Sequence, residues 1–106
     1  KKAMNDLQTL AKDTRTLYGA EAKYLVAQQL YKAGEYTAAE KEILNFIDQS
    51  TPHAYWLARS FVLLSDVYVA MDKKLDARQY LLSLQQNYHA DDDIEQMINE
   101  RLEKLK

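Results

Sequence analysis

A short apolar pattern occurs three times in this chain and limits what it can fold into. The pattern is an alanine, an isoleucine or leucine four positions later, and a bulky apolar residue three positions after that. Its copies are Ala3-Leu7-Leu10, Ala39-Ile43-Phe46 and Ala77-Leu81-Leu84. Spacings of this kind place all three residues on one face of an α-helix. The pattern therefore predicts helices that bury a small residue together with two large ones.

Turn residues are scarce, which favours helices over strands. The chain has 106 residues but two glycines and one proline, whereas strand-rich folds need frequent turns. Apolar periodicity predicts helices over about residues 2–12, 18–33, 36–49, 52–71, 75–88 and 91–105. We expect Gly34 to end the second helix, Thr51 and Pro52 to begin the fourth, and Asp91 or Asp92 to cap the last. Short loops between these segments predict an all-α fold with antiparallel neighbouring helices.

The central part of the chain repeats itself at a fixed offset. A shift of 38 residues superposes Ala39 on Ala77, and the same shift superposes Ala27 on Ser65. In both halves the small residue of the first helix precedes that of the second helix by 12 positions. Small residues held at one spacing indicate close helix–helix crossings, because a larger side chain would push the two helices apart.

On these residues the chain resembles the tetratricopeptide repeat family, a family of stacked helical hairpins. The family has small residues at these two places, and its Gly-x-Tyr turn is matched by Gly34-Glu35-Tyr36. The second unit departs from that turn with Asp72-Lys73-Lys74-Leu75. The family period is about 34 residues, so the longer offset implies an added helical turn, expected at Thr51–Tyr55.

The resemblance implies one domain over residues 1–106, built as a right-handed solenoid of about two and a half repeats. It assigns residues 1–13 to the second helix of a truncated repeat, 18–50 and 52–90 to two repeats, and 91–106 to a capping helix. The start at Lys1-Lys2 suggests a piece of a longer protein. Two segments, EAKYLVAQQLYKAGEYTAAE and YWLARSFVLLSDVYVA, look most like repeat proteins of bacterial cell envelopes. This favours the envelope or periplasm over the cytoplasm, and an exposed truncated face would allow a homodimer.

In such a solenoid the first helix of each hairpin lines the concave face. The candidate partner-binding residues lie beside the packing stripe of these helices: Glu21, Tyr24, Gln28, Tyr31, Arg59, Val62, Asp66 and Val69. Aromatic and arginine side chains are the usual interface anchors, which singles out Tyr24, Tyr31 and Arg59. The alternative is that these side chains only cover the groove or pack on an upstream helix. The family's Lys and Asn clamp for a terminal carboxylate is absent here, which argues against chaperone tails as partners.

Composition and motifs argue against several other classes of function. The net charge is −2 with interspersed signs, and no basic stripe indicates nucleic-acid binding. No apolar run approaches the roughly 20 residues of a membrane span, and cysteine is absent. His89 and the acidic run Asp91–Asp93 fit a helix cap better than a metal site, because the spaced oxygen ligands of a cation loop are missing. No glycine-rich phosphate loop is present, so we expect no enzyme activity, no cofactor and no metal.

The sequence thus predicts a non-catalytic protein–protein interaction scaffold that binds a protein or peptide on its concave face. The alternative is structural: a C-terminal cap or self-association segment of a longer solenoid, with no partner of its own.

Overall fold

The computed structural model describes residues 17–49 and 53–105, which form α-helices and connecting turns. The helices are α2 (Leu17–Lys32), α3 (Tyr36–Asp48), α4 (Ala54–Ala70), α5 (Lys74–Asn87) and α6 (Ile94–Lys104). Their bounds agree within a few residues with five of the predicted helices. No strand occurs among the described residues, so the predicted all-α class is confirmed. The predicted helix over residues 2–12, the Thr51–Pro52 start signal and the truncated face proposed for a homodimer lie outside the described residues.

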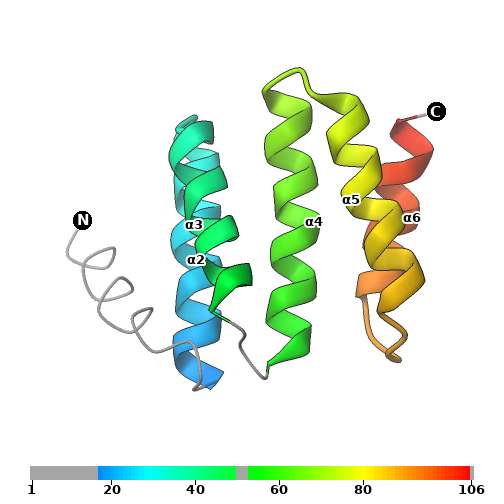
Figure 1. Cartoon of the computed structure of the whole chain (residues 1–106), viewed down its shortest axis with the longest axis horizontal. Coiled ribbons are helices and arrows are strands. Elements are labelled where there is room, and N and C mark those ends of the chain that lie inside the picture. Colours follow the sequence, from blue (N-terminus) through cyan, green and yellow to red (C-terminus); the bar gives the residue numbers. More distant parts are fainter. Residues whose placement is uncertain (1–16, 50–52, 106) are drawn as a thin grey trace.

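The helices are arranged around α4, which lies between the α2–α3 pair and the α5–α6 pair (Figure 1). Consecutive helices run in opposite directions, as short loops predict, so α2, α4 and α6 share one direction. Helix α2 packs against α3 and α4, and α3 also packs against α4. Helices α5 and α6 pack against α4 and against each other. Helix α4 therefore forms the second hairpin with α5 and also packs against both helices of the first hairpin.

The turn between α2 and α3 ends the first helix through a left-handed residue. Gly34 has a φ of 81°, and its N–H donates to the carbonyl of Tyr31 at 3.0 Å. The N–H of Glu35 reaches back to the carbonyl of Leu30 at 2.9 Å. This pair of bonds is the Schellman motif, which satisfies carbonyls that a helix end otherwise leaves unpaired. The predicted role of Gly34 is confirmed.

The same turn recurs between α4 and α5, although its sequence differs. Asp72 has a φ of 62°, and its N–H donates to the carbonyl of Val69 at 3.1 Å. The N–H of Lys73 donates to the carbonyl of Tyr68 at 2.7 Å. Aspartate adopts the left-handed region more readily than most residues, because its short polar side chain can bond locally. The two hairpins thus turn in the same way 38 residues apart, with aspartate in place of glycine.

The small residues of the repeat lie in the core, as the sequence predicts. Ala39 and Ala77 are 0% exposed, and Ala27 and Ser65 are 1% exposed. The Ser65 hydroxyl donates to the carbonyl of Val62 at 2.6 Å, which satisfies the polar group inside its own helix. The large partners of the pattern are also buried: Ile43, Phe46, Leu81 and Leu84. The pattern therefore marks the helix faces that meet in the core.

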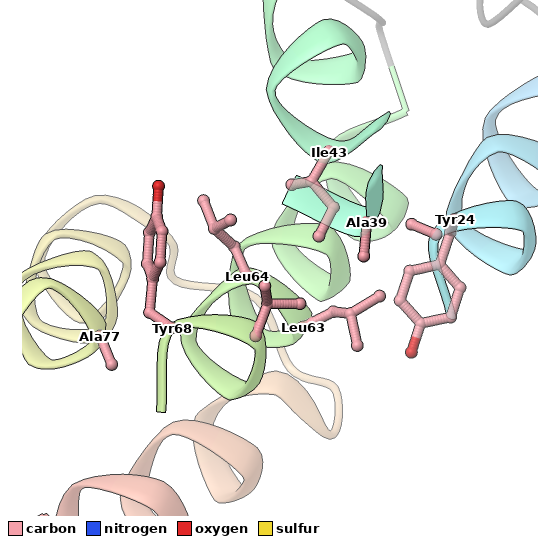
Figure 2. Packing of buried hydrophobic residues seen from close by; sticks show 9 residues of the cluster. Tyr24, Ala39, Ile43, Leu63, Leu64, Tyr68 and Ala77 are labelled. Carbon is pink, nitrogen blue, oxygen red and sulfur yellow. The ribbon is translucent and has the colours of Figure 1, made fainter. Parts of the chain in front are cut away.

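Helix α3 meets α4 at one of these small residues. Figure 2 shows Ala39 and Ile43 of α3 facing Leu63 and Leu64 of α4, within one cluster of buried side chains. Every CH₂ group buried in such a cluster stabilises the fold by about 0.8 kcal/mol. The absence of a larger side chain at Ala39 lets the two helices approach closely enough to share this cluster.

The acidic run before α6 fixes the start of that helix. The N-cap residue of α6 is Asp93, one position after the predicted Asp91 or Asp92, and its side chain makes no capping hydrogen bond. Asp92 still stabilises the start of the helix, because the N–H of Ile94 donates to its carboxylate at 2.9 Å. The Tyr55 hydroxyl donates to Asp93 at 2.8 Å, and the Tyr88 hydroxyl donates to Asp92. Ile94 is 0% exposed in a cluster with residues of α4 and α5. These contacts place the first turn of α6 against the beginning of α4.

Two classes of site are missing from the described part of the chain. Within residues 17–49 and 53–105, no group of three or more His, Asp or Glu side chains is arranged to hold a metal ion. None of the helices described there combines the length and apolar character that crossing a membrane requires.

Candidate partner-binding site

A groove of about 940 Å³ lies between the three helices that run in the same direction. Its lining includes Tyr31 of α2, Asp66 and Val69 of α4, Lys74 of α5, and Arg101 and Lys104 of α6. These helices come together here because α4 contacts both α2 and α6. The groove therefore lies on the face formed by the first helix of each hairpin and by the last helix.

An ion pair joins two walls of this groove. Arg101 Nε donates to Asp66 Oδ1 at 2.8 Å and Arg101 Nη2 donates to Asp66 Oδ2 at 3.0 Å. Arg101 Nη1 donates to the carbonyl of Met97 at 3.2 Å. The two side chains are 29% and 24% exposed, so solvent screens the pair only in part. A two-pronged, charge-assisted pair of this kind fixes the orientation of α6 as well as its distance from α4.

The remaining lining combines an apolar surface with charges of both signs. Val69 is one of the exposed large hydrophobic residues, with 39% of its surface accessible. Burial, followed by the nearby Asp66 carboxylate, raises the pKa of Tyr31, so its hydroxyl stays protonated and can donate a hydrogen bond. Lys74 and Lys104 contribute positive charge to the lining, while Glu100 contributes negative charge. Such a surface can bury an apolar side chain and pair with polar groups on either side of it.

A second cluster lies nearer the beginning of α4, around Arg59. The Cζ atom of Arg59 is 4.9 Å from the ring centroid of Tyr24, 5.7 Å from that of Trp56 and 6.0 Å from that of Tyr55. These distances fall within the range of cation–π attraction. Arg59 Nη1 donates to the Tyr55 hydroxyl at 3.5 Å, whereas Nε is shielded from solvent and has no hydrogen-bond partner. An unpaired buried donor lowers the stability of the fold by about 1–3 kcal/mol. Arg59 is therefore held mainly by its contacts with the aromatic rings, and its hydrogen bonding is incomplete.

The structure places six of the sequence-predicted residues in two environments. Tyr31, Asp66 and Val69 line the groove. Tyr24 and Arg59 belong to the aromatic cluster, where the Gln28 amide donates to the Tyr24 hydroxyl at 3.5 Å.

Three of the predicted residues do not line the groove, and two of these three are almost fully buried. Tyr24 is 6% exposed and Val62 is 3% exposed, so each offers little surface to a partner. Val62 packs in the cluster that contains Ile94 and Ile98 of α6. Glu21 is partly exposed and lines neither the groove nor the aromatic cluster.

The sequence-based prediction did not include the contribution of α6. Arg101 and Lys104 lie in the segment predicted to be a cap, and Lys74 lies at the start of a second helix. Arg101 was the one sequence signal for a contact between this helix and another helix. It is a lone arginine on the apolar side of an amphipathic helix, and a charge in that position needs a partner. Its partner is 35 residues away in the sequence, however, and only the packing of α6 on α4 identifies it.

The chain matches no family model, no curated protein and no solved structure. The resemblance to tetratricopeptide repeats therefore depends on the residues and on how the helices pack.

Proposed function

We propose that this chain is a tetratricopeptide-like, non-catalytic scaffold that binds a segment of a partner protein in the groove between α2, α4 and α6. The observation that carries the proposal is the groove itself, whose volume of about 940 Å³ is comparable with clefts that bury ligands. It is lined by the first helices of two successive hairpins, where solenoids of stacked helical hairpins bind their partners.

The repeated geometry of the two hairpins supports the family assignment. Both hairpins turn through a left-handed residue with the same two backbone hydrogen bonds, at Gly34 and at Asp72. Both bury a small residue at the same place in the second helix, Ala39 in one and Ala77 in the other. Sequence and local structure therefore repeat at the same offset.

The groove suits a short segment that presents an apolar side chain between polar groups. Val69 and the ring of Tyr31 offer apolar surface, while Lys74 and Lys104 offer charged donors. The ion pair between Arg101 and Asp66 holds two walls in place before a partner arrives. A wall that is already ordered lowers the entropy cost of binding.

A structural role for α6 is the second candidate. This helix buries Ile94 and Ile98 against α4 and α5, and it exposes Glu95, Gln96 and Asn99 to solvent. A helix with one apolar and one polar face is what closes the end of a repeat array. Deletion of residues 92–106 should therefore lower stability and solubility, and an equally stable, soluble product would contradict the cap.

Selection from a displayed library of short peptides tests the groove. We expect peptides selected on the whole chain to lose binding to Val69→Lys, because a charge then occupies the apolar part of the groove. Leu75→Lys is the matched control, since Leu75 is 79% exposed on α5 and does not line the groove. Selection of no peptide, or equal binding to both variants, would contradict the proposal.

A further inference from the structure

Arg59 differs from the other partly or fully buried cations of the described chain. Lys23 Nζ lies 2.9 Å from a carboxylate oxygen of Glu42, and Arg101 is paired with Asp66. Across residues 17–49 and 53–105, no carboxylate is recorded within ion-pair distance of Arg59. Its hydrogen bonding is also incomplete, because Nε has no acceptor and the bond from Nη1 to Tyr55 is long, at 3.5 Å. Within the described residues, the guanidinium is thus held in place without a counter-ion.

Three aromatic rings lie close to this guanidinium. The rings of Tyr24, Tyr55 and Trp56 all lie within 6.0 Å of its Cζ atom. Trp56 also contacts the rings of Tyr24 and Tyr55, at centroid distances of 5.6 and 5.2 Å. Rings packed against one another restrict the planes that the guanidinium can adopt. A restricted guanidinium loses less entropy when it binds a planar anion.

Arg59 lies on the same side of α4 as the groove. It precedes Asp66 by seven residues, which is about two helical turns and about 10 Å along the helix axis. An extended peptide covers this distance with about three residues. A segment bound at Val69 and Asp66 can therefore reach Arg59 without leaving α4.

We propose that Arg59 binds a carboxylate of the peptide segment that occupies the groove, about three residues from the part of the segment that lies beside Asp66. Arginine pairs with carboxylates through two parallel hydrogen bonds. A carboxylate would give the guanidinium a stronger acceptor than the Tyr55 hydroxyl. The inference rests on the proposed function, because the carboxylate is assigned to that same partner.

The surroundings of Arg59 favour a carboxylate over a phosphate. The Tyr55 hydroxyl, which accepts from Arg59, donates to Asp93 at 2.8 Å. Asp93 therefore places a negative charge one side chain away from the guanidinium. A second negative charge on the ligand would be repelled by it, so a monovalent anion fits the site better than a divalent one.

Trp56 allows a direct test, because it is the chain's single tryptophan and lies 5.7 Å from the Arg59 guanidinium. The probes are sodium acetate and sodium phosphate, titrated with sodium chloride to keep ionic strength constant, with Trp56 fluorescence and its indole N–H resonance as readouts. We expect a saturable change with acetate that is lost in Arg59→Gln and kept in Arg78→Gln. Arg78 is an exposed arginine of α5, so its replacement changes the net charge equally. No saturation in the unmodified chain, equal saturation in Arg59→Gln, or tighter binding of phosphate would overturn the proposal.

Peptide selection separates this inference from the function on which it rests. Peptides selected on the unmodified chain should carry Asp or Glu at one position, and replacing that residue by Asn or Gln should weaken binding by about tenfold or more. The same replacement should have no effect on binding to Arg59→Gln, whose folding is checked by its urea midpoint. Peptides that depend on Val69 but show no acidic preference would overturn the role of Arg59 and leave the groove intact. Peptides that are insensitive to Val69→Lys would instead contradict the groove.

Discussion

The guanidinium of Arg101 on α6 forms two parallel hydrogen bonds with the carboxylate of Asp66 on α4, at 2.8 and 3.0 Å. This relationship connects the stability of the last helix with the shape of the groove. It fixes the distance and the angle at which α6 lies beside α4, and Lys104 is carried into the groove with it. Helix α6 therefore both covers the core and supplies part of the proposed binding surface.

A double-mutant cycle should measure a favourable coupling between these two residues. For Asp66→Ala, Arg101→Ala and the double variant we expect a coupling of about 1 kcal/mol in urea unfolding, because the pair is bidentate and partly shielded. Added salt should reduce it. The same cycle on Asp76 and Arg78, both exposed on α5, is the control. A coupling for Asp66 and Arg101 no larger than the control value would contradict the role of the pair.

The two left-handed turn residues should respond in opposite directions to substitution. Asp72→Gly should stabilise the chain by up to about 1 kcal/mol, because a non-glycine residue is strained in this conformation. Gly34→Ala should destabilise it by about 1–2 kcal/mol. A Cβ at Gly34 would meet no atom within 4 Å, so this loss would be conformational and not steric. Thermal unfolding measures both changes, and a loss of stability in Asp72→Gly would show that the aspartate side chain is needed.

The buried alanines should not tolerate a larger side chain. Ala39→Leu and Ala77→Leu should each cost about 1–3 kcal/mol through overpacking, because both positions are 0% exposed. Ser83→Leu, at an exposed position of α5, is the control and should change stability by less than about 0.5 kcal/mol. Unchanged unfolding of both alanine variants would contradict the close helix crossings inferred from the repeat.

The free energy of unfolding should decrease in alkaline solution. Burial and then the hydrogen bond to Asp92 raise the pKa of Tyr88 to about 12, and burial also raises the pKa values of Tyr31, Tyr55 and Tyr68. A raised pKa means that folding favours the protonated phenol. Its contribution is therefore complete below the ordinary value of 10.0 and is lost as the pH rises through the folded-state value.

Urea unfolding at increasing pH, combined with tyrosinate absorbance, measures this effect. Tyr88→Phe should remove a part of the absorbance change that occurs near pH 12. Titration of all tyrosines in one step at their ordinary pKa, with no loss of stability, would contradict the buried and hydrogen-bonded positions of these hydroxyls.

The sequence predicts the core well because the core depends on helical periodicity. Ala39 and Ala77 could be assigned to helix crossings because each is followed by large apolar residues at helical spacing. The repeat offset then indicated which helices correspond. Gly34 was recognisable because glycine commonly ends a helix. The sequence also predicted a tight turn at Asp72-Lys73, but it did not predict the left-handed conformation of Asp72, since aspartate occurs in many other settings.

The site is less predictable because it depends on how separate helices pack. The register of α2 and α4 placed Tyr24 and Val62 on the concave side, but it did not show what covers them. Tyr24 is covered by Trp56 and Arg59, and Val62 by α6. Helix α6, which was predicted only as a cap, therefore covers Val62 and contributes Arg101 to the groove. Periodicity within one helix contains no information about such contacts.

The most direct test of the account is to map where a selected peptide binds by following amide chemical shifts of the whole chain during titration. We predict that the largest changes occur at Tyr31, Val69 and Arg101, which represent the three walls of the groove. Changes concentrated instead around Leu44 of α3 and Leu75 of α5, two exposed large apolar residues outside the groove, would contradict the claim that the face formed by α2, α4 and α6 binds the partner.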